Sequence, residues 1–201
     1  MTRQVFRVNS GGRINRDRPV TFTFDGRTYE GFEGDTLASA LLANGVTFIA
    51  RSFKYHRPRG VMTAGSEEPS ALVTIGAGSR AEPNTRATVA EIYDGMVATS
   101  QNAWPTLGTD IGAINNLLSP FFSAGFYYKT FLWRGLNGWF FYVKFIRRAA
   151  GMGEAPGEGD PDAYDRLEAF CVILVVGSGP EGIAAALQAV RAGKQVMLVE
   201  E

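Results

Sequence analysis

Residues 172–201 read VILVVGSGPEGIAAALQAVRAGKQVMLVEE. The stretch has an apolar run at 172–176, a G-x-G-x-x-G turn at 177–182, an Ala-rich segment and a second apolar run at 196–199. Strand, glycine turn, helix and strand in this order are typical of a Rossmann-type unit that binds a dinucleotide. We therefore predict, over 171–201, the N-terminal βαβ unit of an FAD/NAD(P)-binding domain.

Each glycine of the turn has a physical task. Gly177 allows a sharp turn off the strand, Gly179 lets the backbone approach a pyrophosphate, and Gly182 lets the helix pack closely on the strand. The N-terminus of the helix offers unpaired N–H groups to the phosphates. The candidate cofactor-binding residues are Gly177, Gly179, Glu181, Gly182, Glu200 and Glu201.

Two acids bear on which cofactor is expected. Glu200 lies 23 residues after Gly177, near the spacing of an acid that accepts hydrogen bonds from an adenosine ribose. Glu200 mildly disfavours NADP, but it does not distinguish NAD from FAD, because both use this turn. The alternative to a dinucleotide site is a glycine turn that binds nothing. Glu181 places a carboxylate where a small residue is usual; it could point outward, because anions are tolerated near a helix N-terminus.

One helix and two strands do not complete a doubly wound sheet. A parallel pair also needs cover on both faces. We therefore expect a truncated α/β domain at the end of the chain, and the chain to be the N-terminal part of a longer protein.

Composition narrows the class of protein. The net charge is zero, which argues for neither nucleic-acid nor membrane binding. Cys171 is the only cysteine, so no disulfide within the chain and no cysteine-based metal site can form, and a cytoplasmic location is favoured. Cys171 precedes an apolar run and is expected to be a small core residue. The N-terminus lacks the apolar run of a signal peptide.

The N-terminal part begins with a polar, Arg-rich stretch, 1–19, which we expect to be an extended arm. Strands are predicted at 20–24 and 27–32, because Asp25-Gly26 between them is a strong two-residue hairpin signal. Further strands are predicted at 46–49 and 89–93.

A helix is predicted over 36–44, with Asp35 as its N-cap and Gly45 closing it. This ββα opening resembles the β-grasp fold of plant-type ferredoxins, in which the next stretch supplies C-x4-C-x2-C cluster ligands. Residues 53–72 contain no cysteine. We therefore predict an α+β, ferredoxin-like β-grasp domain over 20–110 that has no cluster and no metal and is structural.

The stretch 51–60 reads RSFKYHRPRG and interleaves basic and aromatic residues. Such a pattern suits a nucleic-acid strip, a phosphate contact or a docking loop, and equally a solvated loop anchored by Phe53 and Tyr55. His56 has no identifiable Ser or Cys partner. It is expected to serve structure or docking rather than catalysis.

Aromatic residues crowd 120–145, within a segment 111–150 that we expect to be helical. Charged residues and glycines interrupt it, so a membrane span is not expected. A core segment and a subunit-docking surface remain open as alternatives. Residues 151–170 are acidic and rich in glycine and proline, which is typical of a linker.

Several unusual strings resemble, in the same order, the alpha subunits of heterotetrameric sarcosine oxidases. They are Ser52–Gly60, Thr63–Gly65, Glu67–Pro69, Tyr93–Gly95, Ala98–Asn102, Trp104–Pro105, Asn115–Phe121, Ala124–Phe131 and Ile146–Gly151. With the glycine motif, the resemblance covers about residues 14–201.

The resemblance implies an enzyme subunit. These oxidases convert sarcosine, water and oxygen to glycine, formaldehyde and hydrogen peroxide, or pass the one-carbon unit to tetrahydrofolate as methylenetetrahydrofolate. It further implies NAD at the glycine motif, FAD on a beta subunit, FMN at the alpha–beta junction, a C-terminal folate region beyond this chain, and gamma and delta subunits. No catalytic residue can be placed, and the chain alone is expected to be inactive.

Two other functions remain open. A related flavin-dependent amine or opine dehydrogenase, or a hydrogen cyanide synthase-type subunit, shares the layout but is expected to keep cluster cysteines. A non-catalytic subunit-docking module is the third possibility.

Overall fold

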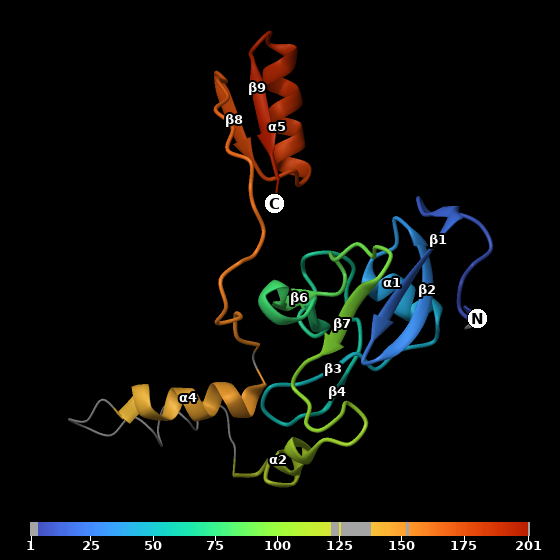
Figure 1. Ribbon diagram of the computed structural model, residues 1–201, viewed down its shortest axis with the longest axis vertical. Helices are drawn as coiled ribbons and strands as arrows, with labels where there is room; N and C mark the ends of the chain where they lie inside the picture. The colour runs from blue at the N-terminus through green and yellow to red at the C-terminus, as the bar shows by residue number, and fades with distance from the viewer. Residues whose placement is uncertain (1–3, 122–124, 126–137, 152, 201) are drawn as a thin grey trace. The chain divides into compact units, whose positions relative to one another are not determined.

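The computed structural model describes residues 4–121, 125, 138–151 and 153–200 of the chain. The chain divides into two compact units, Met1–Pro161 and Asp162–Glu201 (Figure 1). The division falls inside the stretch 151–170, whose assignment as a linker stays a prediction.

The larger unit is built on a mixed five-stranded sheet with the strand order β2-β1-β7-β5-β6. β1 pairs antiparallel with β2 and parallel with β7, and the remaining neighbours are antiparallel. The strands are β1 (Asn15–Phe24), β2 (Arg27–Glu33), β5 (Leu72–Ile75), β6 (Glu82–Arg86) and β7 (Met96–Ser100). Two short strands, β3 (Ala50–Arg51) and β4 (Pro58–Arg59), form a separate pair. A mixed sheet with a helix is the α+β arrangement expected from the sequence.

The hairpin between β1 and β2 is formed as predicted. Asp25 and Gly26 both have positive φ, 48° and 73°, which a two-residue turn between right-handed twisted strands requires. β1 begins earlier than predicted, however, because Asn15 pairs with Glu33 across an irregularity that ends at Pro19. The last part of the predicted arm, 1–19, therefore belongs to the sheet.

Helix α1 (Leu37–Ala43) begins at a different cap from the one predicted. Thr36 is the N-cap, and its side-chain oxygen accepts a hydrogen bond from the Ser39 N–H. Asp35 is 1% exposed and instead accepts hydrogen bonds from the Phe32 N–H, the Ser39 hydroxyl and the Arg7 guanidinium. The Asp35 carboxylate, predicted to cap the helix, is thus bound by the guanidinium of Arg7, 28 residues away in the sequence.

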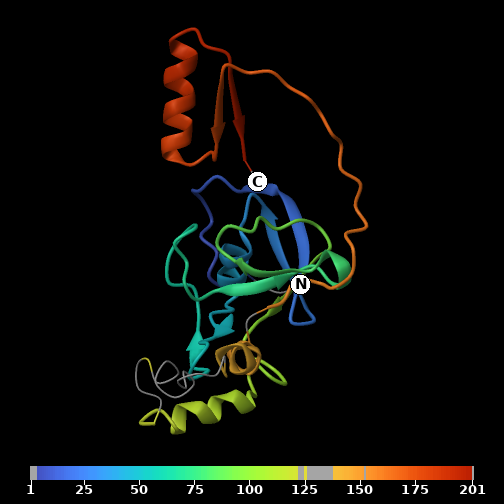
Figure 2. The ribbon, with the colours of Figure 1, turned by 90° about the vertical axis from the view of Figure 1, so that its left-hand side faces the viewer.

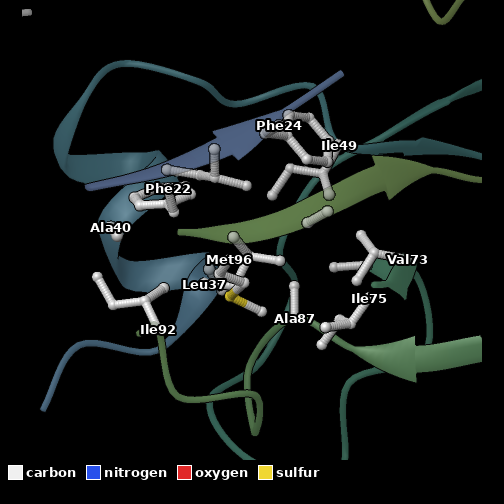
Figure 3. Close-up of a cluster of buried hydrophobic side chains, with 14 residues drawn as sticks. Phe22, Phe24, Leu37, Ala40, Ile49, Val73, Ile75, Ala87, Ile92 and Met96 are labelled. Carbon is white, nitrogen blue, oxygen red and sulfur yellow. The ribbon is translucent and has the colours of Figure 1, made fainter. Parts of the chain in front are cut away.

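The core lies between α1 and the sheet. Figure 3 shows side chains from β1, α1, β5 and β7 pointing toward one another in this layer. The largest apolar side chains with almost no exposure are Phe22, Leu37, Leu41, Ile49, Val73 and Met96.

Two predicted strands are absent from the described structure. Val46–Ile49 is not a strand, although Ile49 is fully buried; β3 begins immediately after it. Val89–Tyr93 is a loop that buries Ile92 and makes one isolated bridge, between Glu91 and Thr36. In both segments an apolar side chain, Ile49 or Ile92, is buried in the core although its backbone is irregular and is not part of a β-strand.

The short helix η1 (Gly78–Arg80) connects β5 to β6, and η2 (Ile111–Ala113), α2 (Ile114–Leu117) and the longer α4 (Gly138–Ala150) follow the sheet in the chain. Helix α4 exposes Phe140, Phe141 and Phe145. The other aromatics of the predicted interface segment, between 122 and 137, lie outside the described residues. Among the helices of the described ranges, none has the length and hydropathy to cross a bilayer.

The smaller unit is β8 (Ile173–Val176), α5 (Pro180–Arg191) and β9 (Val196–Val199). The two strands are parallel, with Ile173 opposite Val196 and Val176 opposite Val199, and α5 lies along them (Figure 2). Only Ala186 of this unit's described apolar residues is buried, whereas Val176 is 77% exposed. Cys171, expected in the core, is only partly buried.

Candidate functional site

The predicted glycine turn joins β8 to α5. Gly177 has φ 101°, which favours glycine, and its N–H donates to the Val199 carbonyl oxygen at 2.8 Å. A Cβ at Gly182 would overlap the Gly177 carbonyl oxygen, so the first turn of α5 can lie against the end of β8 only if residue 182 is glycine. The turn therefore has the close helix–strand packing that a dinucleotide site needs.

Gly179 is the N-cap of α5, and Pro180 follows at the first helical position. No side chain caps this end, so the N–H groups of the first turn point out of the helix without intrahelical partners. Such a helix end attracts phosphate. The backbone at Gly179 is open: the nearest atom to a Cβ built there is Glu181 Oε2, at 3.6 Å.

The two acids of the prediction both lie at this turn. Glu200 accepts a hydrogen bond from the Ser178 N–H, 22 residues away in the sequence. Glu181 is exposed, but its carboxylate lies beside Gly179, so it must rotate away if a phosphate is to approach. Glu201 lies outside the described residues. The structure thus brings Gly177, Gly179, Glu181, Gly182 and Glu200 together around one turn.

A second polar cluster surrounds His56, which is 6% exposed. Its Nδ1 lies 2.7 Å from Asp110 Oδ2, and Arg51 Nη1 donates to the His56 carbonyl oxygen at 2.7 Å. Asp110 also accepts hydrogen bonds from the Trp104 and Gly112 N–H groups. This network ties the 51–60 stretch to the loop around 104–112, which agrees with a structural role for His56.

A third polar feature, which sequence reasoning missed, is the buried carboxylate of Glu68. It is 1% exposed and accepts hydrogen bonds from four backbone N–H groups. Burial raises the pKa of Glu68, but these N–H groups, those of Thr63 and Met62 foremost, outweigh burial and hold it below its ordinary value. Glu68 is therefore an anion enclosed by its own loop.

Two protein families match parts of the chain. The model of the 2Fe-2S iron-sulfur cluster binding domain matches residues 17–103, and the model of the FAD dependent oxidoreductases matches residues 173–201. The two units thus combine similarity to a cluster-binding class of domain with similarity to a flavin-dependent class of oxidoreductase.

The curated relatives are more particular, and they confirm the resemblance expected from the sequence. Sarcosine oxidase subunit alpha of Rhizobium meliloti (strain 1021) is 60% identical over 196 residues, which is 98% of this chain and 20% of that protein. The subunit of the same name from Corynebacterium sp. (strain U-96) is 36% identical over 195 residues, 96% of this chain and 15% of that protein. The chain therefore spans about a fifth or less of the length of these relatives.

One solved structure, an L-proline dehydrogenase from P. horikoshii, aligns with 92% of this chain and 25% of its own chain. Its TM-score is 0.42 and its sequence identity 20%. This likeness is too loose to establish a shared fold.

The cofactors implied by the two families fit unequally. Residues 17–103 contain no cysteine, so the thiolates that hold a 2Fe-2S cluster are absent. No group of three His, Cys, Asp or Glu side chains within the described ranges is arranged to hold a metal. The turn at 177–182, by contrast, suits the pyrophosphate of a dinucleotide, because its backbone is open at Gly179 and its helix end is uncapped.

Proposed function

We propose that the chain is part of the alpha subunit of a sarcosine oxidase, an oxidoreductase in which the 171–201 unit contributes the pyrophosphate-binding turn of a Rossmann-type dinucleotide site. The observation that carries the proposal is the open, uncapped helix end at Gly179, in a chain 60% identical to a sarcosine oxidase subunit alpha. The reaction is the oxidative demethylation of sarcosine to glycine, with hydrogen peroxide and either formaldehyde or methylenetetrahydrofolate.

The cofactor at the turn is NAD, with FAD as the alternative. The pyrophosphate accepts hydrogen bonds from N–H groups at the start of α5, and the helix dipole favours its charge. Glu200 leaves the Ser178 N–H and accepts hydrogen bonds from the ribose instead. The match to FAD dependent oxidoreductases supports a flavin as the alternative occupant.

The N-terminal unit is a β-grasp domain without a cluster that supports the assembly. The sheet order, with β1 and β7 parallel at its centre, supports this proposal. The exposed aromatics of α4 suit a contact with a partner subunit. The proposal also includes beta, gamma and delta partner subunits, with FAD and FMN in the assembly. It further includes a folate region elsewhere in the subunit and a cytoplasmic location.

The test compares two glycine-to-alanine variants in the whole protein. At Gly179 an added Cβ meets only ordinary contact, so Gly179→Ala leaves the turn folded but puts a methyl group in the path of the pyrophosphate. At Gly157, a Cβ meets nothing within 4 Å, which makes Gly157→Ala the matched control. Calorimetric titration with NAD and with FAD measures the affinity.

We expect Gly179→Ala to weaken binding of one dinucleotide roughly tenfold or more, and Gly157→Ala to leave it unchanged. The tighter-binding dinucleotide in the wild-type protein identifies the cofactor. Equal affinity in the two variants, or no binding of either dinucleotide by folded wild-type protein, would contradict the proposal.

A further inference from the structure

The loop 62–71 keeps the spacing of a cluster loop without its ligands. In plant-type ferredoxins the first three thiolates are spaced C-x4-C-x2-C. Thr63, Glu68 and Ala71 have this spacing, and they lie inside the segment that matches the 2Fe-2S domain. A threonine, a glutamate and an alanine therefore stand where that pattern puts cysteines.

The Glu68 carboxylate lies between the two ends of this loop. Oε2 accepts hydrogen bonds from the N–H groups of Met62 and Thr63, at 2.7 and 2.8 Å. Oε1 accepts from the N–H groups of Ser70 and Ala71, at 2.7 and 3.1 Å. Inward-pointing N–H groups are what an anionic cluster needs, because hydrogen bonds to its sulfurs stabilise it. Here each carboxylate oxygen takes two of them.

Two residues at and just after the end of β6 also hold this loop. The buried Thr88 donates its hydroxyl to the Gly65 carbonyl oxygen at 2.6 Å. Arg86 Nε donates to the Glu68 carbonyl oxygen at 3.1 Å. Thr88 thus stands where a fourth ligand, distant in sequence, would reach the loop.

We propose that the carboxylate of Glu68 replaces the iron–sulfur cluster as the anion that organises the loop 62–71, and that positions 63, 68, 71 and 88 retain the geometry of a cluster site. The domain can then fold without iron, because the negative charge that the N–H groups require is supplied by the chain itself. The lowered pKa of Glu68 agrees with a carboxylate that stays ionised in this loop.

The first test removes the charge and keeps the shape. Glu68→Gln turns one oxygen into an NH₂ group, which faces two backbone N–H donors with no acceptor. We expect the melting temperature of the whole protein to fall by roughly 10 °C, the loss expected when buried hydrogen bonds to a charge are broken. Glu67→Gln, at the exposed neighbouring residue, is the matched control and should change it by about 1 °C or less. A Glu68→Gln variant that melts with the Glu67→Gln control would overturn the proposal.

The second test rebuilds the site. The variant Thr63→Cys/Glu68→Cys/Ala71→Cys/Thr88→Cys is reconstituted anaerobically with iron and sulfide, beside a control that carries the other three cysteines but keeps Glu68. We expect about two iron atoms per chain and a paramagnetic signal on reduction in the fourfold variant only. Folded fourfold variant that takes up no iron would refute the retained geometry. If that variant does not fold with or without iron, the stability of Glu68→Gln decides the proposal.

Discussion

The carbonyl oxygen of Gly177 lies against the Cα of Gly182, so that any side chain at residue 182 would overlap it. This contact sets how closely α5 can approach β8. The glycine at 182 is thus required by packing in the protein alone, whereas the glycine at 179 has free space beside it.

We predict that Gly182→Ala destabilises the smaller unit, because α5 must move off β8 to admit the methyl group. The cost is about 1–3 kcal/mol, as for other overpacked sites. Hydrogen exchange of the β8 and β9 amides in the whole protein measures it, and these amides should exchange faster. Gly157→Ala, in open space, should leave the exchange rates unchanged. Unaltered exchange in Gly182→Ala would show that the contact is not limiting.

We predict that Glu200→Ala weakens binding of NAD about tenfold, because the hydroxyl groups of the ribose lose their acceptor. Discrimination against NADP should fall as well, since the carboxylate that repels a 2′-phosphate is gone. Competition titrations with NAD and NADP give both quantities. Glu158→Ala, at an exposed acid of the linker stretch, is the control. The role given to Glu200 is wrong if this variant binds both nucleotides as the wild type does.

We predict that the Arg7–Asp35 pair stabilises the N-terminal unit far more than the exposed pair Arg18–Glu33. The side chains of the first pair are 13% and 1% exposed, those of the second 71% and 46%. Asp35→Ala leaves a nearly buried guanidinium without its partner and should cost about 3–5 kcal/mol of unfolding free energy. Glu33→Ala should cost roughly 0.5 kcal/mol or less. Denaturant titration compares them, and equal midpoints would contradict the assignment.

We predict that the protein loses stability in acid through Glu68 and Asp35. Burial raises the pKa of each carboxyl. Hydrogen bonds from backbone N–H groups nonetheless hold the pKa of Glu68 below its ordinary value of 4.5, and hydrogen bonds from Arg7 and Ser39 hold the pKa of Asp35 below its ordinary value of 3.8. The unfolded chain therefore binds protons first as the pH falls. The stabilisation is complete above about pH 5 and is lost progressively below about pH 4.5.

Urea midpoints measured from pH 7 to pH 3 test this dependence. Glu68→Gln removes one of the two titrating groups, so its midpoint should fall less steeply in acid than that of the wild type. A Glu67→Gln control should keep the wild-type slope. Parallel slopes for Glu68→Gln and the wild type would show that Glu68 does not titrate with folding.

Prediction from sequence succeeded where the signals are local. The hairpin turn at Asp25-Gly26 was correct because two residues determine its geometry. The strands expected at 172–176 and 196–199 were also found, at 173–176 and 196–199, with the expected helix between them. β5, β6 and β7 were missed. For β7 the pairing of Phe22 with Met96 shows why, since its partner strand β1 is far away in the chain. β5 and β6 pair with each other across a short connection, and no two-residue turn signal like Asp25-Gly26 marks it.

The candidate site divides in the same way. Its glycines could be named from their spacing, since a strand, a turn and a helix are consecutive in the chain. The contact of Glu200 with the Ser178 N–H, however, exists only when β9 pairs with β8. The sequence offered no partner for His56, because its partner Asp110 is 54 residues away and reaches it only in the folded chain.

By itself the sequence determined the βαβ order, the absence of thiolate ligands from the N-terminal domain and the resemblance to sarcosine oxidase alpha subunits. Each of these follows from residue types and spacing along the chain. Only the tertiary structure decided where the buried charges go: Asp35 accepts hydrogen bonds from Arg7 and Ser39 rather than capping α1, and Glu68 lies in the loop where a cluster would lie. The reason is physical, because a carboxylate can be buried only when folding encloses it with donors, and for these two acids folding brings those donors into place.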